Sequence, residues 1–274
     1  NAGKKKLRNR LGRDAAIAAL DAEGFERKTT SFYRYVTISD PNSMRDLLYS
    51  EWANMGVLGR VYIAKEGINA QISVPEPQWS KFIETLHSHK EFVSMHQKIA
   101  IEDEGKSFFK LIVKVKEQIV ADGLAFGEYD ITNVGNHLNA EQWNEAMEKG
   151  ATIVDMRNHY ESEIGHFEGA ICPQSETFKE ELPEVLIDLK DKEDDQILLY
   201  CTGGIRCEKA SAYLKHHGFN DVNQLHGGII DYARQIELDE GLDNKFIGKN
   251  FVFDERLGER ISDEVISNCH QCGE

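Results

Sequence analysis

A cysteine, two glycines and an arginine lie within the six residues Cys201–Arg206. The apolar run 196–200 precedes the cysteine and predicts a buried parallel strand. The stretch 208–217 has helical spacing and is followed by Gly218, a common helix stop. Cys201 is therefore expected at the end of a strand, in a loop that leads into the first turn of a helix.

A loop of this kind favours the ionised form of the cysteine. Its backbone N–H groups converge on one point, and the helix dipole adds positive potential there. Glycines let the backbone curl without Cβ clashes, and the arginine adds a permanent charge. A thiolate held in this field has a lowered pKa and is nucleophilic near neutral pH. We take Cys201 as the candidate catalytic residue, supported by the loop residues Thr202, Gly203, Gly204, Ile205 and Arg206. The alternative is a buried cysteine at a strand end, followed by an ordinary turn.

Three further residues are candidates for supporting roles. A short strand over 151–155 ends at Asp155, and ligand sites of parallel sheets lie beyond the carboxyl ends of the strands. Asp155 and Arg157 would fix the loop or bind substrate, or would form a structural ion-pair network instead. Cys207 is either a resolving thiol for a disulfide or persulfide, or a small buried helix residue.

These residues belong to a segment in which strands and helices alternate, taken as a domain over 139–245. A helix is expected after Asn139, with a capping-box pair at Asn139 and Gln142. Strands over 196–200 and 222–225 follow, and a helix is expected over 229–236. The alternation predicts an α/β domain with a parallel sheet that helices cover on both faces.

The preceding segment, 29–118, is expected to be a separate α+β domain. Its pattern gives strands over 32–38, 57–64, 68–74 and 108–115, with helices over 42–55 and 77–89. The order βαββαβ is the ferredoxin-like or acylphosphatase-like plan, which many RNA-binding proteins use. Phe32, Tyr33 and Tyr35 could stack on bases, or could pack in the core or at a sheet edge.

Three remaining segments complete the expected organisation. Residues 1–28 form a basic arm and a short helix, and residues 119–138 read as a linker. Residues 246–274 form a C-terminal extension that ends in a Cys-x-x-Cys pair. Cys269 and Cys272 have half of a zinc-ribbon spacing, so they are weak metal candidates that cannot fill a tetrahedral site alone.

The composition limits the class of protein. No apolar run approaches the roughly 20 residues that cross a bilayer, and no signal-peptide pattern is present, so we expect no membrane partner. Five cysteines, an odd number, favour a reducing, cytoplasmic compartment. Residues 1–120 carry 19 Lys/Arg against 15 Asp/Glu, whereas the rest carries 13 against 32. A polyanion would therefore contact the front of the chain, unless the charges only form a solvated surface.

Two motifs together resemble a rhodanese domain. The first is a strand that ends in Asp155-Met156-Arg157, followed by the turn Gly165-His166-Phe167-Glu168-Gly169-Ala170; the second is the cysteine loop. The six-residue loop is similar to that of sulfur-transferring members, whereas the related dual-specificity phosphatases have one residue more.

The whole chain resembles a narrower family, the bacterial rhodanese-containing tRNA uridine hydroxylases. The resemblance rests on the segments 65–70, 155–161, 201–209 and 251–258. It implies oxygen-dependent conversion of the wobble uridine 34 of tRNA to 5-hydroxyuridine, with Cys201 as the essential cysteine. It also implies the tRNA anticodon loop as partner, molecular oxygen as co-substrate and zinc as a possible component of a complete tail. No flavin, haem or non-haem iron pattern is recognisable, and DNA is not expected to bind.

Two alternatives differ from this function. A sulfurtransferase would carry a persulfide on Cys201 and pass its sulfur to cyanide or an acceptor protein. An RNA-binding module would contain a rhodanese domain without activity, so replacing Cys201 by alanine would have no effect.

Overall fold

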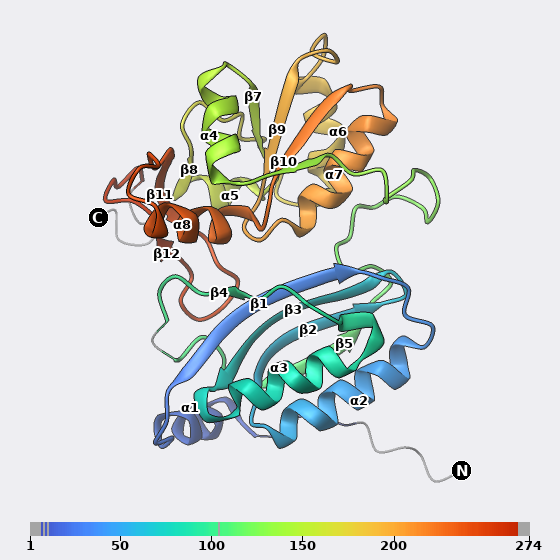
Figure 1. Cartoon of the computed structure of the whole chain (residues 1–274). Coiled ribbons are helices and arrows are strands. Elements are labelled where there is room, and N and C mark those ends of the chain that lie inside the picture. The colour runs from blue at the N-terminus through green and yellow to red at the C-terminus, as the bar shows by residue number, and fades with distance from the viewer. Residues whose placement is uncertain (1–6, 8, 10, 104, 268–274) are drawn as a thin grey trace. The chain divides into compact units, whose positions relative to one another are not determined.

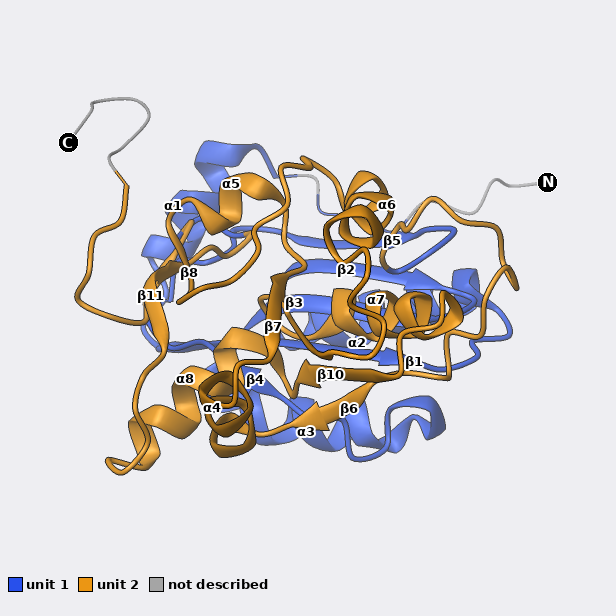
Figure 2. Cartoon of the chain, turned by 90° about the horizontal axis from the view of Figure 1, so that it is seen from above, with its two compact units in different colours: residues 1–119, 254–256 blue, residues 120–253, 257–274 orange. Residues whose placement is uncertain are grey.

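The computed structural model describes residues 7, 9, 11–103 and 105–267. The chain divides into two compact units (Figures 1 and 2). Unit 1 comprises residues 1–119 and 254–256, and unit 2 comprises residues 120–253 and 257–274. Within the described part of the chain, no helix has the length and apolar character needed to span a membrane.

Unit 1 is built around one five-stranded sheet in the order β4-β1-β3-β2-β5. Its strands are β1 (Arg27–Tyr35), β2 (Leu58–Ala64), β3 (Gly67–Pro75), β4 (Lys98–Ile99) and β5 (Leu111–Val115). Its helices are α1 (Arg13–Asp21), α2 (Pro41–Asn54), α3 (Trp79–Ser88) and the short 3-10 turns η1 (Glu76–Gln78) and η2 (Lys90–Phe92).

The last strand of the expected βαββαβ pattern is placed differently from the sequence-based prediction. The short strand β4 lies at one edge of the sheet, antiparallel to β1. The predicted closing strand, 108–115, corresponds to β5, which is added at the other edge and runs parallel to β2. β4 contains two residues, too few to give an alternating pattern, and the sequence therefore showed only the later strand.

The core of unit 1 lies between the sheet and the helices α2 and α3, which cover the same face (Figure 1). Phe32, Trp52 and Phe82 meet there, with ring centroids 5.5–6.4 Å apart. Phe32 is buried, so of the two interpretations offered for this residue the structure supports core packing. Tyr33 and Tyr35 are half-buried and lie on strand β1.

Unit 2 contains the predicted parallel sheet, in the order β6-β10-β9-β7. Its strands are β6 (Asn136–Leu138), β7 (Thr152–Asp155), β9 (Gln196–Tyr200) and β10 (Asp221–Leu225). The helices are α4 (Ala140–Glu148), α5 (His159–Ser162), α6 (Phe178–Asp188), α7 (Ile205–His216) and α8 (Gly228–Leu238). A second, three-stranded sheet joins β8 (Gly165–Phe167), β11 (Phe246–Asn250) and β12 (Glu259–Arg260).

Helices cover both faces of the parallel sheet, as the continuous apolar run of β9 predicts (Figure 1). Ile197 and Leu199 pack with the core residues of α6 and α7. Leu198 and Tyr200 point to the opposite face and pack with those of α4 and α8. Cys201 follows directly, so a rigid, doubly covered strand fixes its position.

The segment 119–138 differs from the expected linker because it takes part in the fold of unit 2. It supplies strand β6 at the sheet edge. It also supplies the buried carboxylate of Asp122, which lies 3.1 Å from the buried ammonium of Lys209 on α7. Residues 1–6, 8 and 10 of the expected basic arm, and Cys269 and Cys272 of the tail, lie outside the described residues.

Candidate active site

The cysteine loop, residues 201–206, connects β9 to α7 at the carboxyl end of the sheet. Gly204 is the N-cap of α7 and has φ of 95°, a conformation that glycine adopts without Cβ strain. The helix begins at Ile205, three residues earlier than the spacing of apolar residues predicts. The first backbone N–H groups of α7, which have no partners within the helix, therefore lie inside the loop.

The Cys201 sulfur accepts hydrogen bonds from several donors in this loop. The N–H of Gly204 lies 3.1 Å from Sγ. Burial raises the pKa of Cys201, but several interactions together outweigh burial: the hydrogen bond from the Cys207 thiol, the charge of Arg206, and the backbone N–H groups of Arg206 and Cys207. The pKa of Cys201 falls from 9.0 to about 6. The sulfur is thus a thiolate at neutral pH, in the field that the loop was expected to create.

The pKa of Cys207 is shifted in the opposite direction from that of Cys201. Burial, and then its contact with Cys201, raise the pKa of the Cys207 thiol well above its usual value. It therefore keeps its proton and donates it in a hydrogen bond to the neighbouring thiolate. Both cysteines are buried, with free thiols. The structure thus brings Cys207 to the reactive sulfur, as a hydrogen-bond donor.

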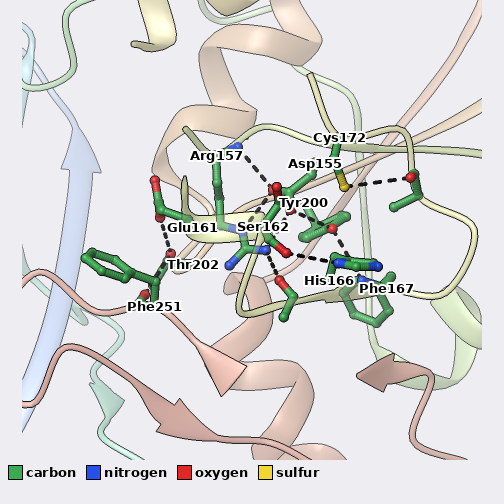
Figure 3. Close-up of polar contacts among 12 residues, drawn as sticks. Asp155, Arg157, Glu161, Ser162, His166, Phe167, Cys172, Tyr200, Thr202 and Phe251 are labelled. Carbon is green, nitrogen blue, oxygen red and sulfur yellow. Dashed lines mark hydrogen bonds and ion pairs between the residues drawn. The ribbon is translucent and has the colours of Figure 1, made fainter. Parts of the chain in front are cut away.

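Arg206 is held beside the sulfur by Glu161, the last residue of the expected Asp155–Glu161 motif. Its Nη1 lies 2.7 Å from Oε1 and its Nη2 3.0 Å from Oε2 of the carboxylate. Glu161 also accepts a hydrogen bond from the N–H of Asn158, which closes the capping box of α5. A further hydrogen bond comes from the Thr202 hydroxyl (Figure 3). Sequence reasoning gave Glu161 no role, although the Asn158-x-x-Glu161 spacing is a capping-box signal.

Asp155 and Arg157 form a second buried pair. The Arg157 Nε and Nη2 atoms lie 2.8 and 2.6 Å from the two Asp155 oxygens. The Tyr200 hydroxyl donates to the same carboxylate at 2.7 Å, and Arg157 also donates to the Gly165 carbonyl (Figure 3). Burial lowers the pKa of Arg157, but the contacts with Asp155, together with Tyr200 and Glu161, raise it by more. The guanidinium therefore stays charged, and the pair fastens β7, β9 and β8 together.

Glu181, on α6, was not anticipated from the sequence. Its side chain is fully buried, and neither carboxyl oxygen has a hydrogen-bond partner among the described residues. Burial raises the pKa of Glu181 well above its usual value, although Arg206 opposes this shift. The protein interior therefore favours the neutral form of this acid, near the cysteine loop. The sequence did contain a signal for this burial. Glu181 follows Phe178 by three residues, so it lies on the same helix face as the apolar residues Phe178, Leu182 and Val185.

The N-terminus of α8 holds the backbone of the cysteine loop by hydrogen bonds. The N–H groups of Ile229 and Ile230 donate to the carbonyls of Cys201 and Thr202 at 3.0 and 3.3 Å. Gly228 has φ of 68°, and a Cβ at this position would lie 2.5 Å from the Cys201 carbonyl oxygen. The backbone of α8 therefore touches the backbone of the loop with no room for a side chain.

The other described cysteine, Cys172, is not activated. It is half-buried, and burial, with the charge of Asp155, raises its pKa to about 11. In the described part of the chain, no group of three or more His, Cys, Asp or Glu side chains is placed to hold a metal ion. Of the three described cysteines, Cys201 is thus the one whose pKa is lowered.

Comparison with known families agrees with this geometry. Residues 139–235 match the rhodanese-like domain, residues 27–119 the UPF0176 acylphosphatase-like domain, and residues 247–274 the family described as Rhodanase C-terminal. A rhodanese-like domain protein of Staphylococcus aureus, whose structure is solved, is 22% identical and has a TM-score of 0.30; the match covers 40% of this chain and 98% of that one. The family match over residues 139–235 identifies a rhodanese-like domain within unit 2, and Cys201 lies in it.

Two curated relatives narrow the assignment. The tRNA uridine(34) hydroxylase of Leptospira interrogans is 58% identical over 271 residues, which cover 98% of this chain and 74% of the relative. The enzyme of that name from Escherichia fergusonii is 52% identical, over 97% of this chain and 77% of the relative. The chain belongs to the tRNA uridine(34) hydroxylase family.

Proposed function

We propose that this protein hydroxylates uridine 34 of tRNA at C5, and that the Cys201 thiolate is the group that reacts with the base. Family membership supports the reaction and the tRNA substrate. The lowered pKa of Cys201, to about 6, is the single observation that supports its role, because only the ionised sulfur is a competent nucleophile.

The proposed chemistry starts with addition of the sulfur to C6 of the uracil ring. A bond forms between Sγ and C6, and the electrons of the C5–C6 double bond move toward the C4 carbonyl. C5 then takes one oxygen atom from molecular oxygen, and the second atom leaves as water with two electrons and two protons from a reductant. Loss of the C5 hydrogen as a proton and expulsion of the thiolate restore the double bond.

The neighbouring residues support this sequence without reacting. Arg206 and the Cys207 thiol stabilise the Cys201 sulfur as an anion, both before it adds to the base and after it is expelled. Glu161 fixes the guanidinium. Glu181 stays neutral and so does not compete with the thiolate for the positive charge of Arg206.

The substrate segment in this proposal is the anticodon loop, where position 34 lies. Cys201 is 1% exposed, so the base has to leave its stack and enter the loop to reach the sulfur. Unpaired loop bases unstack at lower cost than bases in a duplex. The free thiols Cys172, Cys201 and Cys207 fit a reducing compartment, which supports a cytoplasmic location.

The test measures tRNA nucleosides by mass spectrometry in cells that lack this protein. We expect 5-hydroxyuridine and its derivatives to fall, to return with the parent protein or Cys172→Ala, and to stay low with Cys201→Ala. Growth under ¹⁸O₂ should place the label in the product. A normal nucleoside profile with Cys201→Ala would remove the cysteine from the chemistry. Thiosulfate–cyanide turnover that depends on Cys201, without any tRNA defect, would instead support a sulfurtransferase.

A further inference from the structure

The sheet of unit 1 has one face that differs sharply from the core face. Strand register places Tyr33, Asn69, Tyr62 and Lys114 side by side in one row across β1, β3, β2 and β5. A second row, two residues along each strand, contains Ser31, Gln71, Arg60 and Ile112. We call these eight residues the tyrosine face.

The residues between these rows point to the opposite side. Phe32, Ala70, Val61 and Val113 pair in register across the same strands, and all four are buried. They pack in the core formed with α2 and α3, and these two helices lie together on that side of the sheet (Figure 1). Side chains alternate along a strand, so the tyrosine face is directed away from both helices.

The chemistry of the tyrosine face fits a nucleic acid. It carries two aromatic rings, two amides and two permanent or nearly permanent cations, and none of its eight residues is acidic. Lysines lie over both rings: Lys98 Nζ is 4.5 Å from the Tyr33 ring centre, and Lys116 Nζ is 5.4 Å from that of Tyr62. Lys114, Lys116 and Ile112 are exposed, and both tyrosines are half-buried.

The charge of the chain favours the unit that contains this face. Residues 1–120 carry 19 basic against 15 acidic residues, whereas the rest carries 13 against 32. A polyanion is attracted to the basic part and repelled by the acidic part, so the phosphates of a bound RNA are expected on unit 1.

We propose that the tyrosine face binds an unpaired segment of the tRNA substrate, with Tyr33 and Tyr62 stacking on bases and Arg60 and Lys114 contacting phosphates. This inference rests on the proposed function, which supplies the tRNA. The two tyrosines stand two strands apart, about 10 Å at the usual strand spacing. Aromatic side chains on the open face of a sheet bind single-stranded RNA by stacking two or three bases, and amides read base edges.

Binding is measured by fluorescence anisotropy of labelled tRNA, with the full chain carrying Cys201→Ala so that no turnover occurs. Tyr33→Ala and Tyr62→Ala should each weaken binding by on the order of tenfold, whereas Tyr33→Phe and Tyr62→Phe should bind like the parent, because stacking needs the ring. Circular dichroism melting of each variant shows that the fold is kept.

Salt dependence separates phosphate contacts from stacking. Arg60→Ala and Lys114→Ala should each reduce the slope of log affinity against log salt by roughly one unit. The tyrosine variants should leave the slope unchanged. Lys81→Ala on α3 and Lys90→Ala on η2 are matched controls, since both lysines are exposed and lie outside the tyrosine face.

The outcomes distinguish this inference from the proposed function. Full affinity in the folded tyrosine and cation variants, with a parent that binds tRNA and hydroxylates it, would overturn the tyrosine face alone. A tenfold loss in the Lys81 and Lys90 variants, with none in the tyrosine variants, would also overturn it. A parent that neither binds nor hydroxylates tRNA would overturn both proposals together.

Discussion

Among the described residues of unit 2, two arginine–carboxylate pairs are buried, and they share a two-point geometry. Arg157 meets Asp155 with contacts of 2.6–2.8 Å, and Arg206 meets Glu161 with contacts of 2.7–3.0 Å. They differ in what lies beside the arginine. Arg157 donates to the Gly165 carbonyl and shares Asp155 with Tyr200, whereas Arg206 is one of the groups that lower the pKa of Cys201.

The comparison shows that the effect of a buried ion pair depends on the group beside its arginine, which is a carbonyl for Arg157 and a thiolate for Arg206. Burying both pairs costs desolvation energy, which their mutual attraction and hydrogen bonds offset, and removing one partner leaves that cost unbalanced. The Asp155–Arg157 pair serves to fix strand ends, and we propose no contact between it and the substrate. The Glu161–Arg206 pair serves to hold a positive charge next to a sulfur atom. Four predictions test this division of roles.

The largest expected effect is on stability, from Arg157→Met. Removing one partner leaves the Asp155 carboxylate buried without its charge partner, which costs about 3–5 kcal/mol of unfolding free energy. Denaturant titration followed by circular dichroism measures this loss. The double variant Asp155→Asn/Arg157→Met should recover part of the stability, because no unpaired charge remains. A stability within ~0.5 kcal/mol of the parent would show that the pair does not hold the strands.

The next effect is on the reactivity of the sulfur, from Arg206→Met. In the parent, the alkylation rate by iodoacetamide that depends on Cys201 should rise with pH and reach half its maximum near pH 6. Loss of the guanidinium should move this midpoint upward, toward the value of an ordinary thiol, because the thiolate loses an adjacent positive charge. Roughly nine-tenths of the sulfur is ionised at pH 7 in the parent, and the variant should have clearly less.

Two further variants control for folding and charge. Arg206→Lys keeps a cation and should keep the midpoint below that of Arg206→Met. Glu161→Gln/Arg206→Met removes both charges of the pair, so it should fold better than the single variant and still show the raised midpoint. An unchanged midpoint in this double variant would assign the low pKa to the backbone groups and Cys207.

An upward shift of similar size is expected from Cys207→Ala, because its thiol is the first of the groups that lower the pKa of Cys201. The Cys207 thiol donates to the Cys201 sulfur, and hydrogen bonds to charged groups contribute about 1.5–3 kcal/mol, or about one to two pH units. The matched variant is Cys207→Ser, because its hydroxyl can still donate. The same alkylation titration reads both. If alanine and serine gave the same midpoint, the hydrogen bond would have no part in ionising Cys201.

The smallest effect is expected from Glu181→Gln. Burial favours the neutral form of this glutamate, so a neutral amide of similar shape should leave the alkylation midpoint within a few tenths of a pH unit. Raising the pH in the parent should eventually ionise Glu181 and weaken the hold of Arg206 on the thiolate. A midpoint that falls strongly in the glutamine variant would mean that Glu181 is already charged at neutral pH.

The general fold was predictable where patterns were long. The apolar run of β9 and the helical spacing after it gave the strand and the helix around the cysteine. The capping box at Asn139 gave the start of α4. The two-residue strand β4 and the three-residue strand β6 gave no periodic signal, so these edge strands of unit 1 and unit 2 were missed.

The site was predictable only in part, because electrostatics depends on contacts between distant segments. The loop itself contains Cys201, Gly204 and Arg206, and their order in the sequence was sufficient to locate it. Glu161 reaches Arg206 from a different helix, and Glu181 approaches from α6. The partner of a charged side chain, and the pKa that follows from it, come from packing that no local pattern contains.

The backbone contact at Gly228 has a consequence for how this domain can change over evolutionary time. A methyl group there would collide with the Cys201 carbonyl oxygen at 2.5 Å, the Thr202 carbonyl oxygen at 2.6 Å and the Gly203 nitrogen at 2.7 Å. Evolutionary change at position 228 would therefore force the loop and α8 apart. A hydrogen atom, the smallest possible side group, is thus what preserves this contact between the two backbones.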